Sequence, residues 1–162
     1  MKIQFFTTGG TIDKVYFDAK SEYEVGSPQV LEVLREVNVG FEYEVESILR
    51  KDSLDISDED RHLIRARVES AACRQIVVTH GTDTMIDTAR VLLGVSDKTI
   101  VLTGSMQPAR FRTTDASFNI GCAIAAVQCS PPGVYVVMNG RIFNPNRLRK
   151  NRERNIFEDL PE

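Results

Sequence analysis

The chain has 162 residues, of which 42% are hydrophobic and 27% charged, and its net charge at neutral pH is −3. This length suits a single domain with its own core, and the composition is that of a globular protein. The weak negative charge disfavours a nucleic-acid binder or a membrane-surface protein, and no apolar run approaches the roughly 20 residues of a membrane span.

The cysteines and histidines argue against a metal site. Cys73, Cys122 and Cys129 lack metal or redox spacing, and we expect them to be reduced, mostly buried thiols of a cytoplasmic protein. The only histidines are His62 and His80, which leaves a Cys/His centre poorly supplied. The N-terminal sequence MKIQFFTTGG does not have the pattern of a signal peptide.

The first strand is expected over residues 3–7, followed by Thr8, two glycines and Thr11. Adjacent glycines allow a sharp turn and the close approach of a ligand. The two threonines would then place hydroxyl groups at the carboxyl edge of the sheet, although a plain turn with solvated threonines is the alternative. Residues 13–27 show no periodicity, and a connecting loop of this length often serves as a lid or a binding loop.

The next elements are a helix, a strand and a second helix. The first helix is expected to begin at Ser27-Pro28, with a buried stripe of Val30, Leu31, Leu34 and Val37. Residues 41–49 alternate apolar residues with glutamate, which predicts a strand near the edge of the sheet. A polar loop with Ser53 and Asp55 follows, and Ser57 caps a helix that carries His62 on its solvated surface.

The stretch IVVTHGTDTMIDTA organises the chain. Its first three residues, 76–78, predict a buried strand, Gly81 ends that strand, and residues 85–93 continue at helical spacing. Thr82 and Asp83 lie in the turn between them, where open α/β sheets bind small ligands. On the turn alone, capping of the helix is the more economical role for Asp83.

Three more strands and a helix complete the pattern. Strands are expected over residues 99–103 and 134–138, with a short strand at 141–143, and a helix begins near Thr114 or Asp115. That helix is rich in small and apolar residues and is expected to pack tightly through Phe118, Ile120, Gly121, Cys122, Ala125 and Val127. Strands that alternate with helices predict an α/β fold with a mostly parallel sheet covered on both faces.

Hydroxyl and carboxylate groups, not a phosphate-binding glycine motif, follow the strands, which disfavours nucleotides. A threonine can act as a nucleophile when a nearby base activates it, and a lysine held by an aspartate could supply that base. Spacing alone does not bring Lys150 to Asp83. We expect residues 1–144 to form the α/β domain and residues 145–162 to be a charged segment without a core face, either a solvated tail or, less favoured, a nucleic-acid patch.

The motifs TTGGTID (residues 7–13) and THGTDTM (79–85) resemble the two signatures of the bacterial-type asparaginase and glutaminase family. The resemblance continues through LTGSMQP (102–108), DASFN (115–119) and VYVVMNGRIF (134–143). It implies the family's larger N-terminal domain, a three-layer flavodoxin-like sandwich that needs no cofactor.

The resemblance also implies roles for individual residues. Thr11 matches the nucleophile of the family, and Tyr23 matches the tyrosine of the mobile loop that assists it. Thr82 matches the second catalytic threonine, Asp83 the aspartate that binds the substrate amine, and Lys150 the catalytic lysine.

The implied substrate-binding residues lie in the same turns. Ser53 and Asp55 match the loop that holds the α-carboxylate of the substrate, and the remaining members of the set are Gly10, Gly81, Thr82, Asp83 and Ser105. His80 is part of the motif and is expected to have a structural role, hydrogen bonding behind the turn.

The implied activity is hydrolysis of L-asparagine to L-aspartate and ammonia through a threonine acyl-enzyme, with L-glutamine as a minor substrate. The resemblance also implies a homo-oligomer, a dimer or a tetramer. Family members are about twice as long, and a C-terminal domain of the neighbouring subunit helps to hold the substrate amine. Two alternatives therefore stay open: a non-catalytic sensor of aspartate or asparagine, and an amidotransferase-type subunit.

Overall fold

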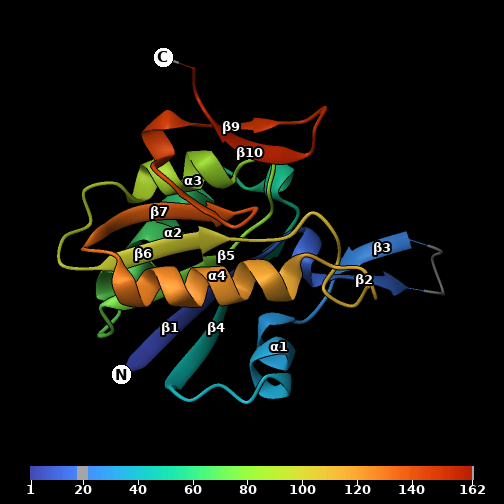
Figure 1. The fold of residues 1–162 in the computed structure, drawn as a ribbon, viewed down its shortest axis with the longest axis horizontal. Coiled ribbons are helices and arrows are strands. Elements are labelled where there is room, and N and C mark those ends of the chain that lie inside the picture. The colour runs from blue at the N-terminus through green and yellow to red at the C-terminus, as the bar shows by residue number, and fades with distance from the viewer. Residues whose placement is uncertain (18–21, 162) are drawn as a thin grey trace.

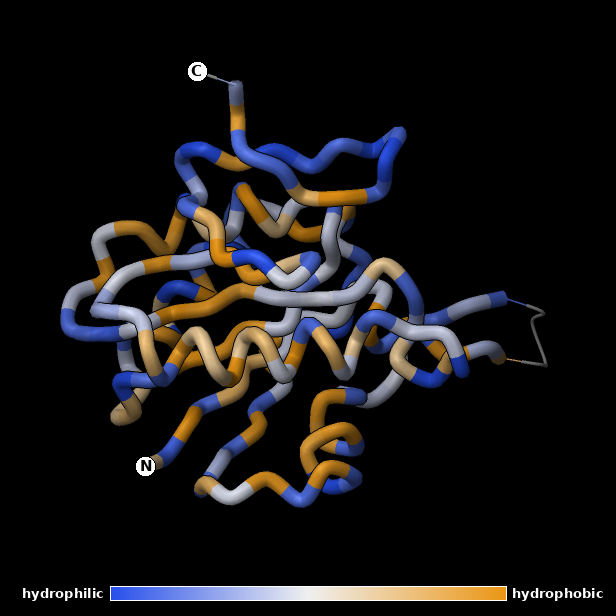
Figure 2. Tube along the Cα trace, in the orientation of Figure 1, coloured by the Kyte–Doolittle hydropathy of each residue, from blue (hydrophilic) through white to orange (hydrophobic). Residues whose placement is uncertain are grey.

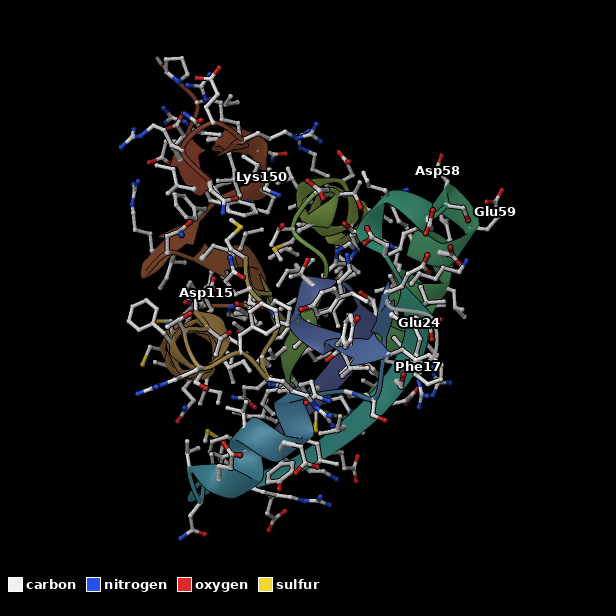
Figure 3. All side chains as sticks on the ribbon, turned by 90° about the vertical axis from the view of Figure 1, so that its right-hand side faces the viewer. Phe17, Glu24, Asp58, Glu59, Asp115 and Lys150 are labelled. Carbon is white, nitrogen blue, oxygen red and sulfur yellow. The ribbon has the colours of Figure 1, made fainter. Side chains whose placement is uncertain are left out.

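The computed structural model describes residues 1–17 and 22–161, and its centre is a six-stranded sheet (Figure 1). In spatial order the strands are β4 (Glu42–Lys51), β1 (Lys2–Gly9), β5 (Gln75–Thr79), β6 (Thr99–Thr103), β7 (Gly133–Met138) and β8 (Arg141–Phe143). The first five are parallel and β8 pairs antiparallel with β7. The carboxyl ends of the parallel strands therefore lie along one edge, which faces the viewer in Figure 3.

Helices cover both faces of this sheet. They are α1 (Val30–Glu36), α2 (Asp58–Ser70), α3 (Met85–Leu92) and α4 (Ala116–Cys129). Successive strand residues point to opposite faces, so Val77 packs in one buried cluster with α1 and α4 while Val78 packs in another with α2 and α3. The prediction of a three-layer α/β sandwich is confirmed. No helix within the described ranges is long and apolar enough to cross a membrane.

Three local predictions are also confirmed. Strand β4, whose glutamates alternate with apolar residues, lies at an edge of the sheet. Ser57 caps α2 through a reciprocal pair of bonds: its Oγ accepts from Asp60 N at 3.2 Å, and Asp60 Oδ2 accepts from Ser57 N at 2.9 Å. His62 is exposed, as expected.

The stretch expected to be a loop, residues 13–27, contains a hairpin instead. After the short helix η1 (Thr11–Asp13), strands β2 (Lys14–Phe17) and β3 (Glu22–Val25) pair antiparallel, while residues 18–21 of the expected loop lie outside the described residues. Most of this ribbon is at least partly exposed on both sides, so its sequence shows none of the alternation that marks a half-buried strand.

The helix boundaries and faces need correction. Helix α1 begins at Val30 and not at Pro28, and Val37, expected in its buried stripe, lies past its end and is 59% exposed. Helix α3 is preceded by Thr84 as its N-cap, so Asp83 does not cap it. In α4, Phe118 is exposed together with Gly121 and Ala125, because only one face of the helix contacts the sheet.

The cysteines are free, as expected, but they are not mostly buried. Cys73 and Cys122 are partly exposed and Cys129 is exposed, because the two cysteines of α4 lie away from the side that contacts the sheet.

The C-terminal segment has a core face that the sequence pattern did not predict. It forms the short helix η3 (Pro145–Arg147) and an antiparallel hairpin of β9 (Leu148–Asn151) and β10 (Ile156–Asp159). Leu148 and Phe157 are each 2% exposed and join the cluster beneath α3. Figure 2 shows the hairpin as mostly hydrophilic with a short hydrophobic stretch. Because the hairpin has so few apolar residues, its sequence shows no hydrophobic periodicity.

Candidate active site

Glycines let three loops meet at the carboxyl edge of the sheet. Gly10 has a φ of 86°, and a Cβ added to it would lie 2.3 Å from Gly81 Cα. A Cβ on Gly81 would lie 2.6 Å from Ser53 Cβ. The turns that follow β1, β5 and β4 are therefore in van der Waals contact, and a side chain at either glycine would separate them.

Lys150 reaches this edge from the C-terminal hairpin. Its Nζ donates to Thr82 Oγ1 at 2.8 Å and to Asp83 Oδ1 at 2.9 Å, although 68 and 67 residues separate it from these partners in the chain. The lysine side chain is only 13% exposed and that of Asp83 is 33% exposed. Figure 3 labels Lys150 on the hairpin. The arrangement is a half-buried lysine held between a hydroxyl and a carboxylate.

Thr11 opens η1 directly after Gly10 and is partly exposed. Because Thr82 directly follows Gly81, the two threonines flank the contact between the two glycines. Thr8, on the other side of the glycine pair, is buried, and its Oγ1 donates to Thr79 O at 3.1 Å, which ties the ends of β1 and β5 together. Thr8 thus has a structural bond, whereas Thr11 is accessible.

Tyr23 lies on β3 of the hairpin and is 51% exposed. Its ring meets Tyr16 edge-on at 5.3 Å and Phe111 at 5.9 Å between centroids. These contacts join the hairpin to the loop between β6 and α4. Within residues 1–17 and 22–161, no hydrogen bond joins Tyr23 to Thr11.

The remaining predicted binding residues occupy different positions. Ser53 is 2% exposed against Gly81, and its carbonyl accepts from Thr84 Oγ1 at 2.6 Å. Asp55, at the end of the short helix η2 (Ser53–Asp55), is exposed. Ser105 is 1% exposed and its Oγ donates to Gln107 O at 2.5 Å, so this hydroxyl is engaged within its own loop.

His80 is fully buried behind the turn, where its ring bonds on both sides. Nδ1 lies 2.7 Å from Gly81 O, and Nε2 lies 2.8 Å from Thr88 Oγ1. Burial lowers the pKa of His80 to about 4, so the ring is neutral at physiological pH. The expected structural role, hydrogen bonding behind the turn, is the one observed.

Sequence reasoning missed two buried or bonded carboxylates beside the site. Asp13 is 2% exposed, and its Oδ1 accepts from Gln29 N at 2.7 Å. Burial raises the pKa of Asp13 to about 7. Asp115, labelled in Figure 3, accepts from the backbone N–H groups of Met106 and Gln107, each at 3.0 Å, and holds the loop after β6. Both residues belong to the motifs TTGGTID and DASFN, and membership of these motifs was the only feature of the sequence that could have identified them.

Among the described residues, no group of three or more histidine, cysteine, aspartate or glutamate side chains could hold a metal ion. The polar groups at the edge are instead hydroxyls, one amine and carboxylates, which are suited to a small polar ligand.

A parallel α/β sheet that carries such groups on the turns at its carboxyl edge defines a class of protein, the open α/β domains that bind small molecules at that edge. The comparison with protein families narrows the class. The family model described as "Asparaginase, N-terminal" matches residues 2–158, and the chain belongs to the asparaginase family.

Individual relatives include asparaginases and an amidotransferase component. The chain is 32% identical over 160 residues to a probable periplasmic L-asparaginase of Haemophilus influenzae, an alignment that covers 91% of this chain and 46% of that protein. Over 81 residues it is 41% identical to a glutamyl-tRNA(Gln) amidotransferase component from Methanococcus vannielii, covering 49% of this chain and 19% of that protein.

A solved structure shows the same fold. The thermostable L-asparaginase from Thermococcus kodakarensis superimposes with a TM-score of 0.84 at 29% identity, covering 98% of this chain and 51% of that chain. Like the alignment with the asparaginase of Haemophilus influenzae, this one extends over about half of the longer protein.

Proposed function

We propose that the chain is an amidohydrolase that converts L-asparagine to L-aspartate and ammonia, with L-glutamine as a minor substrate. The observation that carries the proposal is the pair of hydrogen bonds from Lys150 to Thr82 and Asp83. The three residues are distant in the sequence, so the fold brings them together. An amine held by a carboxylate next to a hydroxyl is the arrangement that activates a hydroxyl nucleophile.

In the proposed reaction, Thr11 Oγ attacks the side-chain amide carbon and gives up its proton toward Lys150 through the hydroxyl of Thr82. The same groups return that proton to the amide nitrogen, which leaves as ammonia, and water then hydrolyses the resulting ester to L-aspartate and free Thr11. Asp83 binds the substrate amine, Tyr23 assists Thr11, and backbone N–H groups near Thr82 stabilise the oxyanion. Gly10, Gly81, Ser53, Asp55 and Ser105 form the surroundings of the substrate, and no cofactor takes part.

The test is ammonia release from the purified protein with L-asparagine, compared with Thr11→Val and Lys150→Met. Because removing a nucleophile or its base costs on the order of 10²–10⁴ in rate, each variant is expected to lose kcat by at least about 100-fold. Normal turnover in both variants would refute the assignment. No release from the wild type, with L-aspartate still raising the melting temperature, would identify the site as a sensor.

The similarity to an amidotransferase component supports a second candidate, in which ammonia released here is passed to a partner protein. The two functions differ in free ammonia: an amidotransferase component alone would release little, and its turnover would rise when the partner is added.

We propose further that the protein is cytoplasmic and forms a homo-oligomer, either a dimer or a tetramer. Its mass in solution, measured by light scattering at working concentration, tests the assembly, and a monomeric mass would reject it.

A further inference from the structure

Asp13 is a buried carboxylate two residues from Thr11 that the proposed reaction does not use. It is 2% exposed, at the end of η1. Its neighbours place it between the turn of Thr11 and the β2–β3 hairpin of Tyr23, which the bond from Lys14 N to Thr11 O also joins.

Both the side chain and the backbone of Asp13 bind the segment beyond the hairpin. Asp13 Oδ1 accepts from Gln29 N at 2.7 Å, just before α1. Asp13 O accepts from Gly26 N at 2.8 Å, one residue after β3. One residue therefore holds the start of the hairpin, its end and the start of α1 to the turn that carries Thr11.

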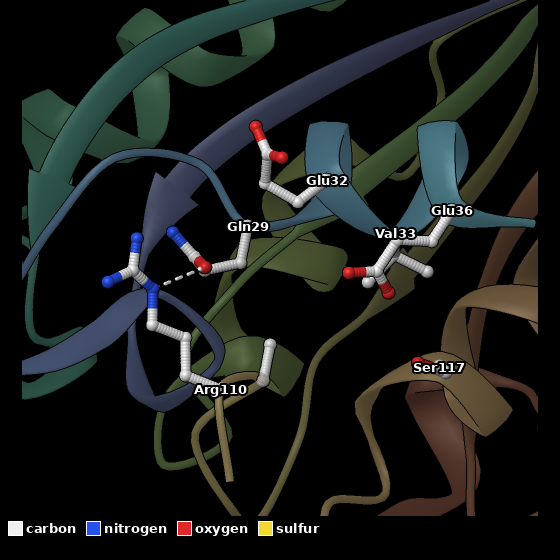
Figure 4. A pocket seen from close by; sticks show the side chains of 7 residues that line it. Gln29, Glu32, Val33, Glu36, Arg110 and Ser117 are labelled. Atoms are coloured by element: carbon white, nitrogen blue, oxygen red, sulfur yellow. Dashed lines mark hydrogen bonds between the residues drawn. The ribbon is translucent and has the colours of Figure 1, made fainter.

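Gln29 extends this link to a third segment. It is 4% exposed, and its Oε1 accepts from Arg110 Nε at 3.0 Å, the dashed line in Figure 4. The neighbouring Ala109 N donates to Ile12 O at 3.1 Å. This loop also carries Phe111, whose ring lies against Tyr23. The position of Tyr23 is thus set by contacts that lead back to Asp13.

From these contacts we infer that Asp13 is a positioning residue, which fastens the Tyr23 hairpin and the β6–α4 loop to the turn of Thr11. The inference rests on the proposed function for its catalytic consequence, while the fastening itself is a property of the fold. Asp13 does not need to touch the substrate in order to act in this way.

Ionisation of Asp13 weakens the link, because a carboxyl whose pKa is raised by burial binds its proton more tightly in the closed form than when opening exposes it to water. Burial raises the pKa of Asp13, and the hydrogen bond from Gln29 and the charge of Arg50 on β4 oppose that rise. Among the charged groups on the adjoining segments, Lys14 pairs with Asp52, Arg110 bonds to Gln29 and Glu32 pairs with Arg35, while Glu22 and Glu36 are exposed.

The experiment compares wild type with Asp13→Asn and with Glu36→Gln as a matched control. The control also removes one carboxylate near this region, but an exposed one on α1. Hydrogen exchange of Gly26, Gln29 and the hairpin is measured at pH 8.5 and 5.5, together with the pH profile of kcat/KM for L-asparagine.

At pH 5.5 wild type is protonated at Asp13, so wild type and Asp13→Asn, which keeps a neutral acceptor, should exchange these amides at similar rates. At pH 8.5 wild type should exchange them faster than Asp13→Asn, and its kcat/KM should lie about tenfold below that of the variant through kcat, as misplaced catalytic groups cause. Glu36→Gln should follow wild type throughout. Equal exchange in all three proteins, or a difference that is the same at every pH, would overturn the inference.

Two further outcomes are separable. If wild type does not release ammonia, the proposed function fails and the exchange measurement alone decides whether Asp13 fastens the hairpin. If Asp13→Asn does not fold, wild type decides: protection of the Gln29 amide should fall relative to that of Val78 as the pH passes 7, and a constant ratio would contradict the inference.

Discussion

Gly10 and Gly81 lie at the candidate site, where neither has room for a side chain. Gly10 also needs its positive φ, but Gly81 is limited by space alone, because Ser53 leaves no room for a Cβ. These contacts bring the turns of Thr11 and Thr82 together. The hydroxyls that the proposal uses therefore depend on the absence of side chains beside them.

Gly81→Ala is expected to destabilise the fold by about 2 kcal/mol through overpacking against buried Ser53, and to reduce ammonia release. The matched control is Gly121→Ala on the exposed side of α4, where nothing lies within 4 Å of the added Cβ. There alanine should stabilise the helix by about 0.5–1 kcal/mol. Thermal unfolding measures both, and equal shifts in the two variants would contradict the contact argument.

At the scale of elements, the β9–β10 hairpin is the one that completes the lysine cluster. Two strands alone are marginally stable, so the hairpin needs its buried contacts to hold Lys150 in place. Phe157 supplies such a contact and is also the residue that pairs with Lys150 across the hairpin. Its packing and the position of the lysine are therefore linked.

Phe157→Ala is expected to cost about 3 kcal/mol, the usual loss for truncating a buried phenylalanine. Part of that loss should appear as local opening, with faster hydrogen exchange in β9 and β10 and lower turnover. Phe118→Ala is the control, because this side chain is 60% exposed, and it should have little effect on either hydrogen exchange in the hairpin or turnover. A hairpin that keeps its protection in Phe157→Ala would refute this dependence.

At the scale of the whole molecule, two buried groups give opposite pH dependences of stability. The pKa of Asp13 is raised by burial to about 7, so the folded state holds a proton that the unfolded chain releases near pH 4. Stability therefore falls as the pH rises from about 4 to 7. The pKa of His80 is lowered by burial to about 4, so the unfolded chain binds the extra proton and stability rises from about pH 4 to 6.5.

The two effects are each worth about 3–4 kcal/mol over their ranges, at about 1.4 kcal/mol per pH unit, and they largely cancel between pH 4 and 6.5. Denaturant unfolding of a variant that lacks one of the two groups should reveal the pH dependence caused by the remaining group. Asp13→Asn should gain stability as the pH rises from 4 to 6.5, and His80→Gln should lose stability from pH 4 to 7. Parallel pH dependences in both variants would contradict these assignments.

The order of strands and helices followed from local pattern, because buried parallel strands are apolar runs and each is followed by a turn and a helical repeat. The strands at residues 3–7, 76–78 and 99–103 were predicted for this reason. The β2–β3 ribbon and the core contacts of the C-terminal hairpin were not, since an exposed ribbon and a hairpin with only Leu148 and Phe157 buried show no periodicity.

The chemistry of the site divides in the same way. Residue type and motif were enough to select Thr11, Thr82, Asp83 and Lys150 as candidates, because these types suit a hydroxyl nucleophile and its base. That Lys150 meets Thr82 and Asp83, and that Asp13 is buried against Gln29, depends on contacts between segments distant in the chain. Such contacts arise from packing the hairpins onto the sheet, and no local pattern in the amino-acid order encodes them.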